Sequence, residues 1–266
     1  MKNNVLWQFN FIGNKKIEEI YIMLGKNEPF IQDTPKDKKE KKENPVQYYV
    51  KFSFMITYVL LMTTATITFI EAIRTPVPEV RHVLNLETCI SVVAGYFYSI
   101  FIGKIEEYGK ADKQIDWADI TQTRYIDWAI TTPMMLLTLC IVLGMNTKTR
   151  IDITTMASII ALNYVMLYLG YLGENKKMDR FTSMWVGFIA FFAMFAIIFI
   201  KFVSPKYVID NYILYGMYLS VWSVYGVAYM FSEEYKNITM NLLDCTAKCL
   251  IGLGLWVYYT KLIKLY

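Results

Sequence analysis

The chain has 266 residues and a formal net charge of +4, and 55% of its residues are hydrophobic, 16% aromatic and only 19% charged. This composition excludes a disordered chain, a collagen and a disulfide scaffold. The net charge is too small to indicate a nucleic-acid partner. The positive mean hydropathy of the chain argues against a soluble protein.

Long charge-free runs predict helices that cross a membrane, because a helix needs about 20 mostly apolar residues to span the hydrocarbon core. Five runs of 19 to 22 residues contain no Asp, Glu, Lys or Arg. Two more segments qualify with charged residues in or next to them. In chain order the seven predicted spans are 52–70, 88–103, 128–147, 153–173, 181–200, 211–232 and 237–260. The predicted fold class is therefore an all-α membrane protein, a seven-transmembrane helix bundle with an N-terminal extension.

The N-terminal extension, residues 1–47, is predicted to be separate from a seven-helix domain of residues 48–266. Apolar residues at helical spacing in 17–24 indicate a short amphipathic helix on the membrane, with a weakly ordered tail as the alternative. Residues 36–43 are a charge run of mixed sign and are interpreted as a linker. The connections between spans are short, and the longest, 104–119, is polar.

The four cysteines all lie in predicted spans and have no disulfide or zinc pattern, so no metal site is expected. The single histidine, His82, lies at the start of the second span and is interpreted as a polar residue at the membrane edge.

Charged residues inside a span are costly and mark a functional site by default. Asp244 and Lys248 are four residues apart and share a helix face, as do Arg124 and Asp127, which are three apart. Thr131 follows on the same face. If the two faces meet in the centre of the bundle, the Lys248 cation has two carboxylates beside it, and Arg124 balances the excess negative charge.

An ion-pair network that only fixes helix packing is the alternative interpretation of these charges. Buried ion pairs are poor stabilisers, so packing gives little reason to keep a lysine in mid-span. A lysine amine in an apolar pocket can instead form a Schiff base with an aldehyde. The many aromatic and methionine side chains in the spans suit an elongated apolar ligand.

Three motifs carry a resemblance to a known family. The segment Arg124-Tyr125-Ile126-Asp127-Trp128-Ala129-Ile130-Thr131-Thr132-Pro133 resembles the third-helix signature of microbial (type 1) rhodopsins. Asp244-Cys245-Thr246-Ala247-Lys248 resembles their seventh-helix retinal-attachment signature, and Trp222-Ser223-Val224-Tyr225 their sixth-helix pocket motif. The resemblance covers residues 48–266.

This resemblance implies all-trans retinal bound to Lys248 as a protonated Schiff base. Asp127 and Asp244 would be its counterions, with Asp127 the primary proton acceptor, and Arg124 would respond to proton arrival on the extracellular side. The family's retinal pocket corresponds to Tyr125, Trp128, Thr132, Met135, Met166, Gly170, Trp185, Trp222, Tyr225 and Tyr229, with Trp185 placed by a looser match in the fifth helix.

Other family positions extend the resemblance. Tyr98 matches a second-helix tyrosine near the counterions. Thr132 and Asn163 fall where some members join the third and fourth helices by a hydrogen bond. Elementary electrostatics agrees with the counterion roles, because a Schiff-base cation needs a nearby anion to stay protonated in a low-dielectric site. Thr131 is expected to hydrogen-bond Asp127 and tune its proton affinity.

Some positions depart from the family pattern. Many proton pumps have a carboxylate eleven residues after the acceptor, where this chain has Thr138, so the usual cytoplasmic proton donor is missing. Gly226 replaces a common proline and Tyr229 a common tryptophan, which affects the shape of the pocket. Asp127 together with Thr131 argues against the chloride-pump and sodium-pump patterns.

The position of Glu87 is compatible with three different functions of the protein. A light-driven outward proton pump would use Glu87 as a substitute donor and release protons past Arg124 and Glu233 or Glu234. A light-gated cation channel would use Glu87 and Asn241 to line its pore. A sensory photoreceptor would need a transducer partner. A carboxylate at the lipid headgroups is the alternative interpretation of Glu87.

The expected location is the membrane, with multiple passes and the N-terminus on the extracellular side by analogy with the family. Basic residues in the short loops are equally frequent on both sides, so the positive-inside rule does not support that orientation. The expected partners are the lipid bilayer, a transported proton or other cation, and further copies of the chain in a homo-oligomer. No enzymatic activity is expected.

Overall fold

The computed structural model describes residues 45–110 and 114–260, so the expected amphipathic helix of residues 17–24 lies outside the described residues. The described residues form α-helices and π-helices joined by short connections. Its elements are α2 (Pro45–Arg74), α3 (Pro78–Lys110), α4 (Trp117–Thr147), α5 (Ile153–Glu174), α6 (Arg180–Ile198), the π-helical η1 (Phe199–Val203), α7 (Ile209–Ala228), α8 (Glu233–Asp244), the π-helical η2 (Cys245–Leu250) and α9 (Ile251–Thr260).

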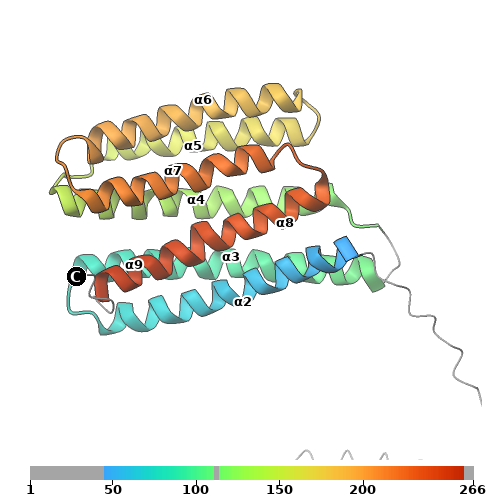
Figure 1. Cartoon of the computed structure of the whole chain (residues 1–266), viewed down its shortest axis with the longest axis horizontal. Coiled ribbons are helices and arrows are strands. Elements are labelled where there is room, and N and C mark those ends of the chain that lie inside the picture. The colour runs from blue at the N-terminus through green and yellow to red at the C-terminus, as the bar shows by residue number, and fades with distance from the viewer. Residues whose placement is uncertain (1–44, 111–113, 261–266) are drawn as a thin grey trace, which may run out of the picture. The chain divides into compact units, whose positions relative to one another are not determined.

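These elements form seven antiparallel rods, because η1 extends α6 and η2 joins α8 to α9 in one continuous rod (Figure 1). The helix α2 packs along α3, α5 packs along α6, and α8 lies beside α2 and α7. We call the end of the bundle where α2, α4, α6 and α8 begin the Glu233 end, and the opposite end the Tyr259 end. A seven-helix bundle is therefore confirmed.

Six of the described rods are long and apolar enough to cross a membrane by length and composition. The seventh, α7, contains tyrosines and serines that lower its hydropathy, but its axis is aligned with those of the other rods in the bundle (Figure 1). The predicted connection 104–119 proves to be shorter, because α3 continues to Lys110 and α4 already begins at Trp117.

Aspartates begin three of the helices. The carboxylates of Asp116, Asp152 and Asp179 accept hydrogen bonds from backbone N–H groups in the first turns of α4, α5 and α6. Such caps satisfy donors that have no partner within the helix. The backbone N–H of Thr155 lowers the pKa of Asp152, and that of Thr182 lowers the pKa of Asp179, both below the usual range for the residue.

The outer surface of the bundle is apolar, which suits a lipid environment. On α6, for example, the exposed side chains Phe181, Trp185, Ile189 and Phe192 recur at helical spacing. In contrast, the interior near the middle of α4 and α8 is polar and charged. This distribution is the reverse of that in a soluble protein, where the interior is apolar and the surface polar. The side chains of the buried charged centre come from the helices around it.

Candidate functional site

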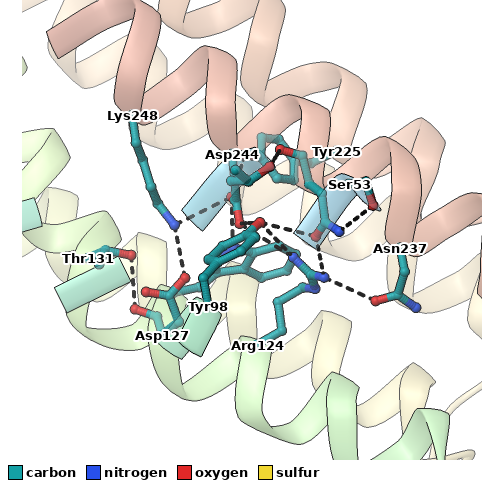
Figure 2. A network of polar contacts seen from close by, with 12 residues as sticks. Ser53, Tyr98, Arg124, Asp127, Thr131, Tyr225, Asn237, Asp244 and Lys248 are labelled. Carbon is teal, nitrogen blue, oxygen red and sulfur yellow. Dashed lines mark hydrogen bonds and ion pairs between the residues drawn. The ribbon is translucent and has the colours of Figure 1, made fainter. Parts of the chain in front are cut away.

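The centre of the site is the ammonium group of Lys248, which is buried between two carboxylates. Its Nζ donates a hydrogen bond to Asp127 Oδ2 at 2.9 Å and lies 3.4 Å from Asp244 Oδ1 (Figure 2). Asp127 comes from α4, and Lys248 lies in the π-helical η2 directly after Asp244 ends α8. Single π-helical turns are rare and occur often at functional sites. The structure thus brings together the two helix faces that the sequence pairs.

Asp244 is held by hydrogen-bond donors from three helices. Its Oδ1 accepts from Tyr225 at 2.7 Å and from the Trp128 indole at 3.3 Å. Its Oδ2 accepts from Tyr98 at 2.8 Å and from Arg124 at 3.4 Å. Donors that point at a carboxylate stabilise its negative charge, so these contacts favour the charged form of Asp244 beside Lys248.

Asp127 has a much sparser environment. Its Oδ2 accepts from Lys248, whereas Oδ1 is buried and has no hydrogen-bond partner among the described residues. Thr131 donates to the backbone carbonyl oxygen of Asp127 at 2.9 Å and not to the carboxylate. The expected Thr131 bond to the acid is therefore absent from the described geometry, and one carboxylate oxygen remains available for a proton.

Arg124 extends the network toward the Glu233 end. Its Nη2 donates to Asn241 Oδ1 at 2.7 Å and to Asn237 Oδ1 at 3.0 Å (Figure 2). The guanidinium also lies over the rings of Phe54 and Phe101. This enclosure keeps a cation next to Asp244 and leads from the centre of the bundle to the first turn of α8.

A cavity lies beside this charged centre and includes Lys248 in its wall. Its lining is mostly aromatic and aliphatic, with Lys248 and Asp244 as the charged groups. The lining residues are Tyr125, Trp128, Thr132, Met135, Met166, Leu167, Gly170, Ser183, Met184, Gly187, Phe188, Phe191, Trp222, Tyr225, Gly226, Tyr229, Met240, Asp244 and Lys248. An apolar ligand with an aldehyde at one end fits this arrangement, because the Lys248 amine and the Asp244 carboxylate lie in the cavity wall.

Nine of the ten pocket residues expected apart from Lys248 line this cavity, and Trp185 does not. The prediction for Trp185 is wrong: its side chain is 54% exposed on the outer face of α6 and packs against Phe181 and Phe188. The neighbouring face of α6 lines the cavity instead. Because a helix advances 100° per residue, an error of one position in matching α6 turns a side chain from the cavity toward the lipid.

Sequence reasoning missed the α6 side of the cavity. Ser183, Met184, Gly187, Phe188 and Phe191 recur at intervals of three and four residues and form one face. This spacing is visible in the sequence, but a second apolar face on the same helix hides it. Met240, one turn before Asp244, was also missed.

Thr132 ties the cavity wall to the neighbouring helix. Its hydroxyl accepts a hydrogen bond from Asn163 Nδ2 at 2.8 Å, and it donates to the carbonyl oxygen of Trp128 at 2.7 Å. The expected bond between the third and fourth rods is thus present in the structure.

Glu87 lies on the other side of Lys248, toward the Tyr259 end. It is 2% exposed, so the interpretation as a carboxylate at the lipid headgroups is wrong. A Cβ at Gly252, one turn beyond Lys248, would come within 2.7 Å of its Oε2. Its Oε1 has no hydrogen-bond partner in the described part of the chain, and the same holds for the hydroxyls of Ser91 and Thr138. Buried polar atoms without protein partners generally bind internal water.

Known proteins share both the sequence and the fold. Residues 48–262 match the family model described as bacteriorhodopsin-like protein. The chain belongs to this family. Bacteriorhodopsin of Halobacterium salinarum is 22% identical over 206 residues, which cover 70% of this chain and 74% of the relative. A green-light absorbing proteorhodopsin of a gamma-proteobacterium is 23% identical over 225 residues, covering 78% and 85%.

A solved structure supports the same assignment. The crystal structure of the viral rhodopsin OLPVRII is 41% identical and has a TM-score of 0.75, covering 80% of this chain and 99% of that chain. The chain is therefore a multi-pass integral membrane protein with the seven-helix rhodopsin fold. Members of this bacteriorhodopsin-like family are ion pumps, channels or sensors, and their cofactor is retinal, bound as a Schiff base to a lysine.

Proposed function

We propose that this rhodopsin is a light-driven outward proton pump in which Lys248 carries all-trans retinal and Asp127 is the proton acceptor. The observation that carries the proposal is the unequal pair of carboxylates beside Lys248. Asp127 Oδ2 is 2.9 Å from Nζ and its other oxygen has no partner among the described residues, whereas Asp244 accepts from four donors.

The residues of the cavity support retinal as the ligand. When bound, retinal supplies light absorption and an isomerisation that moves the nitrogen and its proton. Trp128, Trp222 and Tyr225 hold an elongated apolar molecule in place, and Lys248 supplies the amine at the cavity wall. The protein's contribution is orientation and electrostatics. Asp127 and Asp244 stabilise the positive charge on the nitrogen of Lys248 within the bundle.

Proton release follows from the position of Asp127. Asp127 Oδ2, which accepts the hydrogen bond from Nζ, receives the proton from the nitrogen of Lys248, and Asp244 remains charged because its donors stay in place. The neutral Asp127 no longer attracts Arg124, whose guanidinium already contacts Asn237 and Asn241 toward the Glu233 end. The proton that Asp127 has accepted then passes to the hydrogen-bonded groups around Arg124 and leaves by that end, which we assign to the extracellular side.

Reprotonation requires a donor on the other side of Lys248. Thr138 cannot serve, because a hydroxyl does not release a proton at neutral pH. Glu87 is a buried carboxyl group near Gly252, and the unpartnered hydroxyls of Ser91 and Thr138 provide further polar groups on this side. We therefore assign Glu87 as the internal proton donor and the Tyr259 end as cytoplasmic.

A light-gated channel is the second candidate, and it would line its pore with Glu87 and Asn241. Asn241 is fully buried and bonded at both ends of its amide: Oδ1 accepts from Arg124, and Nδ2 donates to Ser53 Oγ at 2.9 Å. Tyr98 also donates to Oδ1 at 3.1 Å. A residue held in this way closes the path at Arg124, which favours a pump.

Light-induced pH changes test the proposal. Sealed vesicles or cells that contain the retinal-loaded protein should export protons in light, and a protonophore should abolish the pH change. Lys248→Ala should remove both the visible band and the pH change. Asp127→Asn should keep a visible band and lose the pH change. A light response that only dissipates an imposed gradient would contradict pumping.

A further inference from the structure

A second buried lysine lies at the Glu233 end, outside the retinal site. Lys236 is on the first turns of α8, and its side chain is 2% exposed. Its Nζ lies 2.9 Å from Glu174 Oε2, at the end of α5, and 2.8 Å from Glu233 Oε2. One ammonium group thus joins two carboxylates from different rods.

Arg180 completes this group, which we call the exit cluster (Glu174, Arg180, Glu233 and Lys236). Its Nη2 lies 3.3 Å from Glu174 Oε1 and 3.9 Å from Glu233 Oε1. The exit cluster therefore contains two cations and two anions. Arg180 also lies over the ring of Tyr229, which lines the retinal cavity.

The exit cluster lies between a depression at the surface and the ring of Tyr229. Glu174, Arg180 and Glu233 line the depression together with the α5–α6 loop, whereas Tyr229 lines the cavity. The cluster is also joined to the central network, because Asn237 accepts from Arg124 and donates to the backbone carbonyl oxygen of Glu233 at 2.8 Å. These hydrogen bonds connect Arg124 to Glu233 of the cluster through Asn237.

We propose that Lys236 is a tethered cation that occupies the place of a metal ion between Glu174 and Glu233, and so makes the exit selective for protons. This inference rests on the proposed function, since it assumes that protons leave past Arg124. It identifies a specificity-determining residue that touches neither Lys248 nor the retinal cavity.

The physical reason lies in the competition for the two carboxylates. A pair of carboxylates is a favourable site for a hard cation such as Ca²⁺, which binds oxygens at about 2.3–2.6 Å. Lys236 already holds both carboxylates with its Nζ, and it cannot diffuse away. A free cation would have to displace it and leave a buried ammonium without a partner, which is strongly unfavourable. A proton needs no such vacancy, because it moves between hydrogen-bonded groups.

Calcium binding in the dark tests this inference without using pump activity. Calorimetric titration of the purified, retinal-loaded protein with CaCl₂ should show no saturable site in the wild type. Lys236→Gln should show a saturable Ca²⁺ site, because it removes the cation buried between the two carboxylates and leaves only Arg180 beside them. Lys236→Arg keeps the tethered charge and should behave as the wild type. The double variant Lys236→Gln with Glu174→Gln should lose the new site.

Voltage clamp gives a second measurement on the same variants. The Lys236→Gln photocurrent should acquire a reversal potential that shifts when external Na⁺ is replaced by N-methylglucamine, and the wild-type current should not respond. An unchanged current and no calcium site in a Lys236→Gln protein that keeps its visible band would overturn the inference.

Two controls keep the result decisive. If Lys236→Gln yields no visible band, the calcium titration is compared between the wild type and Glu174→Gln. A calcium site in the wild type that Glu174→Gln removes would overturn the inference. The absence of a calcium site from both proteins supports it. Failure of the proposed function looks different, since wild-type vesicles would then export no protons in light whatever the calcium titrations give.

Discussion

Lys248 Nζ lies 2.9 Å from Asp127 Oδ2 and 3.4 Å from Asp244 Oδ1, although both carboxylates are buried beside the same ammonium group. The nearer acid has the fewer additional partners, because the hydrogen-bond donors of the network converge on Asp244. This asymmetry suits two roles: Asp244 stays charged, and Asp127 accepts a proton and later releases it.

Replacing the nearer acid should stop transport. We expect Asp127→Asn to lower the light-driven proton flux at least about a hundredfold, since a positioned acid or base contributes about 10²–10⁴ to a proton-transfer rate. Initial rates of pH change in vesicles, normalised to the visible band, measure this effect. The matched variant Asp244→Asn removes the negative charge beside Arg124 and replaces one of the two acceptor oxygens by an NH₂ donor, so it should destabilise the protein more. Full flux in Asp127→Asn would refute its role as acceptor.

Glu87→Gln should slow recovery of the dark state about a hundredfold, because it removes the carboxyl that returns the proton. Proton release to the Glu233 end should keep its rate. Flash photolysis with a pH-indicator dye separates the two phases. Glu79→Gln, in the exposed first turn of the same helix, is the control and should recover at the wild-type rate. Equal recovery in both variants would eliminate Glu87 as the donor.

Gly252 should be required for the position of Glu87. A Cβ at Gly252 would lie 2.7 Å from Glu87 Oε2 and 3.3 Å from Thr64 Cγ2, whereas one at Gly254 meets nothing within 4 Å. We expect Gly252→Ala to displace the carboxylate, slow recovery and cost about 1–3 kcal/mol of stability. Gly254→Ala should be neutral or stabilising by up to about 1 kcal/mol. Thermal denaturation and flash photolysis of this pair provide the check, and identical behaviour would contradict the packing.

Asp152→Ala should lower the melting temperature in a pH-dependent way. In the folded state Thr155 lowers the pKa of Asp152, and Lys201 pairs with it at 3.0 Å. A carboxylate with a lowered folded-state pKa stabilises the protein above its unfolded pKa of about 3.9, and this stabilisation is lost as the pH falls further. The difference from wild type should therefore be full at pH 7 and shrink below about pH 4. A difference that is constant with pH would exclude the charge as its cause.

The sequence predicts the seven rods well, because unbroken apolar runs leave few alternatives to a membrane span. It also pairs Asp127 with Lys248 correctly, since four residues at helical spacing define two faces that must be buried together. The bonds of Asp244 to Tyr98 and Tyr225 could not be derived in the same way. They depend on the rotation of three separate helices, which no local pattern fixes.

The positions of three residues could not be derived from the sequence, each for its own physical reason. Trp185 lies on a helix with apolar side chains all round, so hydropathy does not distinguish the face toward the cavity from the face toward the lipid. Glu87 lies near one end of its predicted span, and its burial follows from the extension of α3 nine residues before it. The sequence does not single out Lys236, because its partner Glu174 is 62 residues away in the chain.

Voltage-clamped photocurrents of the retinal-loaded protein test the central claim most directly, because they separate active transport from passive flow. We predict an outward current in light at every holding potential, carried by protons and missing in Lys248→Ala. A current that changes sign at the equilibrium potential of any ion, or one that persists in Lys248→Ala, would contradict the account.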